Sequence, residues 1–278
     1  MSRTQIMGVL NATPDSFSDG GLHLDPERAL AAGLKMIADG ADILDVGGES
    51  TRPGSPSISV EEELRRVLPV IAALRSAQVT VEISIDTSKP EVAAAALSAG
   101  ATWINDVTGF RDPRMRALAA ERDCTCVVMH LRGTPADMAE KAIYRDVVAE
   151  VKAELNSAVE AMLAAGIQRQ HIILDPGFGF AKNAAQNLEL LARFGELRDL
   201  GLPLLAGCSR KSFIGAASGE SQALRRLPGT LAAHSAAQLA GARFLRVHDV
   251  AEAVQAARVI DAVTSLQSSA GAPHGSTR

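Results

Sequence analysis

The chain has 278 residues, of which 47% are hydrophobic and 22% are charged, and its formal net charge at pH 7 is −4. This length is enough for one large hydrophobic core, and α/β barrels of this size are commonly a single domain. A mild negative charge without a basic block argues against nucleic acid or an anionic membrane as the main partner, and 3% aromatic residues disfavour a base-stacking platform.

The N-terminal sequence MSRTQIMGVL shows no long apolar segment with a cleavage site, and no run is long enough to span a membrane. The three cysteines, Cys124, Cys126 and Cys208, form no CxxC pair. We interpret them as reduced thiols that pack as small hydrophobes rather than as a metal site. We therefore expect a soluble, cytoplasmic protein.

Short apolar or β-branched runs alternate with longer amphipathic stretches, and this alternation predicts strands and helices in turn. In chain order the elements are strand Ile6–Leu10, helix Pro26–Ala38, strand Ile43–Gly47, helix Val60–Arg75, strand Val81–Asp86, helix Pro90–Ser98, strand Trp103–Val107, a shorter connection at Asp112–Ala120, strand Thr125–His130, helix Asp146–Ala165, strand Ile172–Asp175, helix Ala185–Phe194, strand Leu204–Cys208, helix Leu227–Ala240, strand Phe244–Asp249 and helix Val250–Ser265.

Eight strand–helix units without a break in composition predict an α/β protein with a parallel sheet closed into a (β/α)8 TIM barrel. We expect one domain over residues 1–264. An open, doubly wound sheet is the alternative, although no glycine fingerprint for a dinucleotide follows the first strand. The small polar residues of 265–278 predict a disordered C-terminal tail.

Polar or ionisable residues occupy the ends of most of the predicted strands. In a barrel the active site lies at these carboxyl ends and on the loops that follow them. Taken alone, Asp86 or Asp175 could equally cap the next helix. Recurrence at nearly every strand is harder to explain by capping, and it predicts a polar pocket over an apolar barrel. The residues are Asn11, Asp86, Asn105, His130, Asp175, Ser209, Arg210, Lys211, Arg246 and His248.

Positive side chains gather after strands seven and eight, the usual phosphate corner of such barrels. Arg246 and His248 are two residues apart, so on a strand they should face the same way. An arginine fork suits phosphate oxygens, and a helix that begins after Ser209 would add free amides. Asp86 and Asp175 lie on strands across the barrel. We therefore predict a ligand with donor groups at one end and phosphates at the other; a solvated rim of mixed charge is the alternative.

Two long glycine-containing loops, residues 11–25 and 48–59, follow the first and second strands. Long loops at the catalytic face of a barrel are typical of lids, because purely connective loops there are short. Side chains in these loops that could close over a substrate are Phe17, Thr51, Arg52 and Pro53.

Eight segments resemble, in order, the motifs of the dihydropteroate synthase family of pterin-binding barrels, and together they extend to about residue 264. They are GVLNATPDSFSDGG at 8–21, DVGGESTRPG at 45–54, SIDTSKPEV at 84–92, IND at 104–106, VVMH at 127–130, ILDPGFGFAKN at 173–183, GCSRKSFIG at 207–215 and RVHD at 246–249.

The resemblance implies a role for each residue that matches a motif. It implies catalytic roles for Asp86, Lys211, Arg246 and His248. The implied pterin contacts are Asp86, Ile104, Asn105, Met129, Asp175, Phe180 and Lys211. The implied pyrophosphate contacts are Asn11, Arg52, Arg246 and His248, with Mg2+ bound through Asn11. The implied p-aminobenzoate contacts are Phe17, Thr51, Arg52, Pro53, Lys211 and Ser212.

The resemblance further implies a reaction in folate synthesis, in which p-aminobenzoate displaces pyrophosphate from a hydroxymethyl-dihydropterin. It also implies a homodimer. Cations on the phosphates would assist departure of the leaving group, and the two carboxylates would stabilise a transient pterin cation. Ala181 stands where the family usually has glycine, so we expect a modest shift of that loop. The Ser- and Pro-rich residues 55–59 leave sulfonamide sensitivity open, and a variant of altered sensitivity is possible.

Three other functions remain at this point. A methyltransferase that passes a methyl group from a folate to a corrinoid would share the carboxylate contacts but would not need the SRKS and RVHD segments. A Schiff-base aldolase would use Lys211 as its nucleophile. An idle homologue would have lost its phosphate ligands, whereas Asn11, Arg246 and His248 are present.

Overall fold

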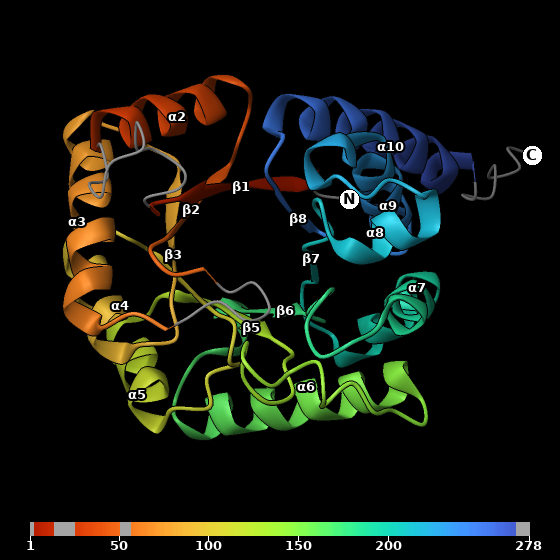
Figure 1. The fold of residues 1–278 in the computed structure, drawn as a ribbon, viewed down its shortest axis with the longest axis horizontal. Helices are drawn as coiled ribbons and strands as arrows, with labels where there is room; N and C mark the ends of the chain where they lie inside the picture. The colour runs from red at the N-terminus through yellow and green to blue at the C-terminus, as the bar shows by residue number, and fades with distance from the viewer. Residues whose placement is uncertain (1–2, 14–25, 51–56, 271–278) are drawn as a thin grey trace, which may run out of the picture.

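The computed structural model describes residues 3–13, 26–50 and 57–270 (Figure 1). Eight parallel strands form one sheet in the order β6-β5-β4-β3-β2-β1-β8-β7, and a parallel bridge between Leu174 and Leu204 joins its two edges. The sheet is therefore closed, which excludes the open doubly wound alternative. The strands are β1 Gln5–Asn11, β2 Ile43–Gly47, β3 Glu82–Asp86, β4 Trp103–Asp106, β5 Thr125–Met129, β6 Ile172–Asp175, β7 Leu205–Ala206 and β8 Phe244–Val247.

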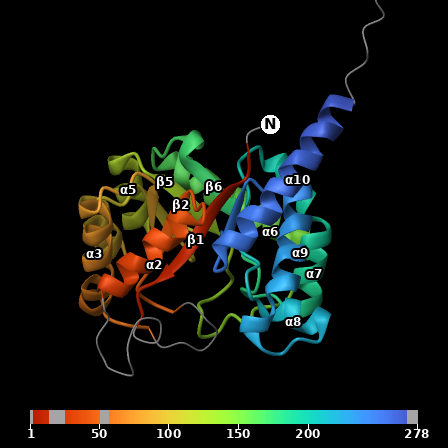
Figure 2. The ribbon, with the colours of Figure 1, turned by 90° about the horizontal axis from the view of Figure 1, so that it is seen from above.

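Helices surround the barrel on the outside (Figures 1 and 2). They are α2 Pro26–Ala38, α3 Val60–Ser76, α4 Pro90–Ser98, α5 Pro113–Arg122, α6 Val147–Ala164, α7 Ala184–Ala192, α8 Ser212–Ser218, α9 Leu227–Leu239 and α10 Val250–Ala270. The predicted strands and helices are thus present with small shifts at their ends. None of the described helices has the length and apolar character that crossing a membrane requires.

Several helices begin where a polar side chain accepts a hydrogen bond from a free backbone amide. Ser59 accepts from Glu62 at the start of α3, and Asp146 accepts from Val148 and Ala149 at the start of α6. These caps satisfy amides that have no partner within the helix. They explain why those helices begin directly after the loops at the carboxyl ends of their strands.

The barrel interior contains an apolar layer, separate from the larger core between strands and helices. Trp103 and Phe244 meet edge to face in this layer, with ring centroids 5.6 Å apart. Side chains alternate across a strand, so the residue two positions later on each strand points into the same interior. This alternation determines which side chains reach the carboxyl end of the barrel. The layer consists of Met7, Ile43, Trp103, Val127, Ile173, Leu205 and Phe244.

Among the boundaries that differ from the expectation, two affect the site and the chain end. β8 ends at Val247, so His248 follows the strand instead of lying on it. The helix α10 continues to Ala270, and the prediction of a disordered tail is therefore wrong for residues 265–270; residues 271–278 lie outside the described part. The helix continues because residues 265–270 contain no glycine or proline that would interrupt it.

Candidate active site

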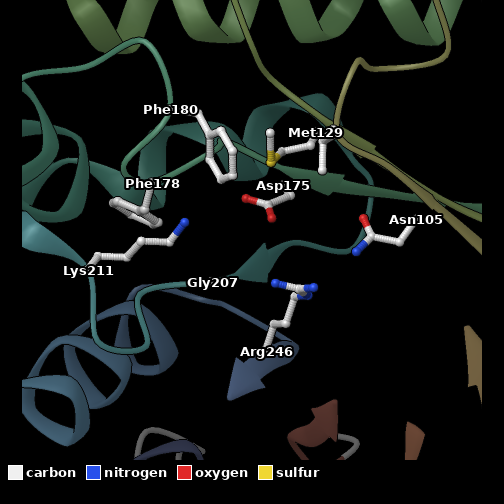
Figure 3. Close-up of a pocket in the computed structure, with 9 residues that line it drawn as sticks. Asn105, Met129, Asp175, Phe178, Phe180, Gly207, Lys211 and Arg246 are labelled. Carbon is white, nitrogen blue, oxygen red and sulfur yellow. The ribbon is translucent and has the colours of Figure 1, made fainter. Parts of the chain in front are cut away.

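A pocket opens at the carboxyl end of the barrel, where the sequence predicts the active site (Figure 3). It brings together residues from β4, β5, β6 and β8 and from the loops after β6 and β7. Its space is only about 20 Å³, room for about one water molecule. A bicyclic ligand therefore needs some of these side chains to move. The lining residues are Asn105, Val107, Met129, Asp175, Phe178, Phe180, Gly207, Lys211 and Arg246.

Arg246 lies between two carboxylates in the barrel interior. Its Nε donates to Asp45 Oδ2 over 2.6 Å, and its Nη2 donates to Asp86 Oδ2 over 2.7 Å. Asn105 Nδ2 donates to the same Asp45 oxygen over 3.0 Å. Sequence reasoning missed Asp45, although it lies two residues after the inner-layer residue Ile43 and so faces the interior.

The expected separation of charge across the pocket is therefore wrong for this structure. Asp86 and Arg246 are in contact, because β8 and β3 point their side chains towards the same barrel axis. A buried charge without a partner is costly, so the arginine pairs with the carboxylates. Asp175 and Arg246 nevertheless line the same pocket, as the predicted ligand arrangement requires (Figure 3).

Burial changes the protonation of the acidic side chains at the site. It raises the pKa of Asp86 to about 7, since the Arg246 cation offsets the loss of solvent only in part. Burial also raises the pKa of Asp175, against the hydrogen bond that its Oδ1 accepts from the Gly177 amide over 2.8 Å. A ligand that offers hydrogen-bond donors would replace the lost solvation and favour the ionised form of both side chains.

Lys211 reaches into the pocket from the loop between β7 and α8. Its Nζ lies 4.1 Å from the centroid of the Phe180 ring, an arrangement that stabilises the cation. Burial and the Arg246 charge nevertheless lower the pKa of Lys211 to about 8. Near neutral pH it is a donor that loses its proton easily.

The loop after β6, residues 176–183, is supported from below by a buried lysine. Lys182 Nζ lies 3.0 Å from His130 Nδ1 and donates to the carbonyls of Gly177 and Phe180, both over 3.1 Å. His130 Nε2 faces Glu154 over 3.0 Å. Sequence reasoning counted His130 among the pocket residues, but it supports this loop and does not line the pocket. The network instead supports the backbone beside the Phe180 ring.

Ala181 adopts a left-handed backbone conformation in this loop, with φ of 46°. Left-handed conformations cost a residue with a Cβ roughly 1–2 kcal/mol. The loop keeps this conformation because Lys182 bonds to two of its carbonyls. The glycine that the family motif usually carries is therefore the less strained choice here.

The basic residues after strands seven and eight divide into separate groups. Arg210 Nε donates to Asp249 over 3.1 Å, whereas Lys211 enters the pocket. His248 Nδ1 lies 2.9 Å from Ser209 Oγ, which also accepts the His248 amide over 3.2 Å. Ser209 thus holds both the backbone and the ring of His248 in place.

His248 is an uncharged imidazole in this structure. Burial, reinforced by the Arg246 and Arg210 charges, lowers its pKa to about 3. A positive charge on His248 is thus disfavoured while no ligand is bound. The ring remains available for uncharged hydrogen bonding.

Ile104 does not line the pocket. It belongs to the core between the barrel and the helices, with none of its surface exposed. Its neighbours Trp103 and Asn105 face the interior, so alternation sends Ile104 outward. The expectation that it packs against a pterin ring is wrong, and Val107 lines the pocket instead.

The remaining predicted residues lie outside the pocket or outside the described part. Asn11 ends β1 and is half-buried, while Ser212 begins α8 and is exposed. In residues 3–13, 26–50 and 57–270 no three His, Cys, Asp or Glu side chains could together hold a metal ion. Phe17, Thr51, Arg52 and Pro53 fall outside the described residues.

Sequence reasoning missed Val107, Phe178 and Gly207 in the pocket. A Cβ at Gly207 would lie 3.6 Å from Asp175 Oδ2, so a larger side chain there would fill the space. Gly207 follows the inner-layer residue Leu205 by two positions, and this signal could have found it. Asp45, Asn105, Asp175 and Arg246 likewise lie two positions after an inner-layer residue, so the same spacing places them in the barrel interior.

Comparison with known proteins agrees with this geometry. Residues 7–248 match the family described as pterin binding enzyme. The Escherichia coli K12 dihydropteroate synthase is 46% identical, over 96% of this chain and 94% of that protein.

Two solved structures share the fold. The Xanthomonas albilineans dihydropteroate synthase with 4-aminobenzoic acid is 48% identical, with a TM-score of 0.89 over 95% of this chain and 94% of that one. The Thermus thermophilus enzyme in complex with 6HMPPP is 48% identical, with a TM-score of 0.81 over 94% of this chain and 95% of that one. The chain therefore belongs to the dihydropteroate synthase family of pterin-binding enzymes.

Proposed function

We propose that this chain condenses 6-hydroxymethyl-7,8-dihydropterin pyrophosphate with p-aminobenzoate, forming 7,8-dihydropteroate and pyrophosphate in folate biosynthesis. One observation carries the proposal: a single pocket joins the buried acceptors Asn105 and Asp175 to the cations Lys211 and Arg246. A pterin has a donor-rich edge and its activated form carries a diphosphate, so this substrate matches both the acceptors and the cations of the pocket. The two solved relatives that hold 4-aminobenzoic acid and 6HMPPP support the same pair of substrates.

The carboxylates Asp175 and Asp86 would hold the pterin ring. Asp175 Oδ2 is directed towards the space that Gly207 leaves open, and Asp86 Oδ1 is buried without a hydrogen-bond partner in the described residues. Both would accept ring donors, while Lys211 donates to the carbonyl side. Met129 and Phe180 line the pocket and supply apolar contacts for the ring faces.

Arg246 and His248 would assist departure of the diphosphate. Ligand binding would draw the tip of Arg246 from Asp86 to the leaving oxygens, which frees that carboxylate for the ring. An uncharged His248 ring would donate a hydrogen bond to the diphosphate in the tautomer that carries its proton on Nε2. Negative charge at Asp86 and Asp175 would then stabilise a pterin cation as the carbon–oxygen bond breaks. An arylamine is nucleophilic when neutral, so attack needs no strong base.

A magnesium ion fits this site only together with the substrate. Asn11 offers one amide oxygen, a ligand that Mg2+ accepts, at the carboxyl end of β1. No three acidic, His or Cys side chains of the described part form a metal cage. The diphosphate and water would complete the coordination, and the ion would neutralise charge on the leaving group.

Assembly as a homodimer and a cytoplasmic location belong to the same proposal. An apolar groove between α7, α8 and α9, lined by Leu188, Phe213 and Ile214 among others, supports contact with a second copy. Light scattering of the purified chain, with Leu188→Glu as the disrupting variant, would test the dimer. A monomer in the unmodified chain would contradict it.

The direct test mixes the purified chain with the pterin pyrophosphate, Mg2+ and p-aminobenzoate and measures pyrophosphate release. Pyrophosphate should appear only when the amine is present. Arg246→Ala should weaken binding of the pyrophosphorylated pterin more than binding of the pterin alone. Arg258→Ala, on the exposed side of α10, is the matched control and should change neither. Equal losses for both ligands in Arg246→Ala would place the arginine away from the diphosphate.

A further inference from the structure

Asp45 is a fully buried carboxylate near the middle of β2, and the proposed reaction gives it no contact with substrate. One of its oxygens, Oδ2, accepts hydrogen bonds from both Asn105 and Arg246, over 3.0 Å and 2.6 Å. Its other oxygen, Oδ1, is buried and has no partner within the described residues. A single side chain thus contacts two residues that line the pocket.

The bond to Asp45 determines how Asn105 faces a ligand. A carboxylate oxygen can only accept, so the NH2 group of Asn105 must be the part that faces Asp45. Asn105 lines the pocket (Figure 3), so its amide oxygen is then left for a ligand. The pocket therefore presents acceptors at Asn105 as well as at Asp175, and Asp86 lies beside it in contact with Arg246.

The bond to Asp45 also fixes one part of Arg246 and leaves another free to move. Nε is bound to Asp45 near the backbone end of the guanidinium, while Nη2 at the tip is bound to Asp86. A diphosphate can take the tip without disturbing Nε. Asp45 thus acts as the fixed point about which the arginine tip exchanges partners.

We propose that Asp45 is a positioning residue that orients the Asn105 amide and anchors Arg246 Nε, so that the pocket recognises a heterocycle edge composed of donors. This inference rests on the proposed function and deepens it, because it assigns the choice of hydrogen-bond pattern to a residue that touches no substrate. Asp45 begins the DVGGESTRPG segment, and the orientation explains why a carboxylate stands there.

Asp45 also contributes to the electrostatics of Asp86. Burial raises the pKa of Asp86, the Arg246 charge lowers it and the Asp45 charge raises it, with a combined result of about 7. Removal of that negative charge should therefore lower the pKa of Asp86. The charged groups that face Asp86 are Asp45 on β2, Glu63 on α3, Asp106 on β4, Lys211 before α8 and Arg246 on β8.

The experiment measures binding of 6-hydroxymethylpterin, which lacks the diphosphate, by calorimetry in the full chain and in D45N, N105A and the double variant. D45N should weaken binding about 10- to 100-fold, the usual scale for loss of hydrogen bonds to a charged group. At a pH where Asp86 is ionised, the same change in the N105A background should cost about threefold or less, because the amide that Asp45 orients is gone and this ligand has no diphosphate for Arg246. Losses that multiply in the double variant would overturn the proposal.

The pH dependence of binding separates positioning from general damage. In D45N the acid limb should move to lower pH, because Asp86 ionises more easily; an unchanged limb or a shift to higher pH would contradict the proposal. D45E keeps the charge and alters the geometry, so it should lose affinity with the wild-type acid limb in place. If D45N does not fold, D45E still decides the matter, since wild-type affinity in D45E would refute the positioning role.

Asp261→Asn is the matched control. Asp261 accepts hydrogen bonds from Thr4 and Gln238 at the opposite end of the barrel, so this change should lower stability without changing pterin affinity or its pH dependence. Failure of the unmodified chain to bind the pterin would refute the proposed function. Normal binding in both the unmodified chain and D45N would refute only the role of Asp45.

Discussion

The barrel interior consists of two adjacent layers with opposite properties. The layer towards the amino ends of the strands is apolar and well packed, with Trp103 against Phe244. Two residues further along the same strands, the interior is filled by Asp45, Asp175 and Arg246. The first layer is stabilised by burial of apolar surface, whereas the second holds charges that burial makes costly.

This difference indicates that stability and recognition are supplied by different layers of one barrel. Buried carboxylates such as Asp86 and Asp175, with raised pKa values, are retained at a cost in stability. The apolar layer beneath offsets that cost. Substitutions in the two layers should therefore have effects of different kinds.

The largest expected effect is on stability, from Trp103→Ala in the apolar layer. Removal of a buried indole costs about 3–5 kcal/mol of the free energy of unfolding, which urea denaturation would measure. If the layers act independently, pterin affinity in the folded variant should change by less than about threefold, since independent sites add within about 0.5 kcal/mol. A loss of affinity without a loss of stability would show that the two layers are not separate.

Asp175→Asn, in the charged layer, should lower pterin affinity without lowering stability. Loss of a charged acceptor for ring donors should cost about 1.5–3 kcal/mol of pterin binding, or about 10- to 150-fold in Kd. The free energy of unfolding should be equal or higher, since an uncharged amide is easier to bury. Calorimetric titration beside thermal unfolding checks both. Unchanged affinity would remove Asp175 from the pterin site.

The pH profile of kcat/KM should sharpen the description of the charged layer. Asp86 must be ionised to accept donors, so activity should rise as pH increases through about 7. Lys211 should lose its proton above about 8, and activity should fall there. In Lys211→Gln the alkaline limb should be absent. An alkaline limb that persists in that variant belongs to another group.

The smallest effect should come from the loop above the charged layer. Ala181→Gly relieves a left-handed alanine with φ of 46° and should raise the free energy of unfolding by roughly 0.5–1 kcal/mol, after the entropy of glycine in the unfolded chain is subtracted. Ala149→Gly, at an exposed position of α6, is the control and should lower it by about 1 kcal/mol. Destabilisation in Ala181→Gly would show that the loop is not strained.

Much of this molecule follows from the sequence alone. Alternating segments predict the barrel, and the positions of Asn105, Asp175, Lys211 and Arg246 at strand ends predict their meeting in one pocket. The period of two on a strand would also have identified Asp45 and excluded Ile104, had it been counted from the inner-layer residues. The end of α10 is harder to predict, because helix ends fray and the first glycine that could interrupt this helix is Gly271.

The pairing of side chains was decided only by the tertiary structure. Arg246 and Asp45 are 201 residues apart and meet because closure of the barrel places β8 beside β1 and β1 beside β2. Local sequence specifies which way each side chain points, whereas strand order and stagger specify which of them meet. Burial then set the charges: the same closure removes water from His248, Lys211 and Asp86 and changes their pKa values, an effect that residue types alone do not contain.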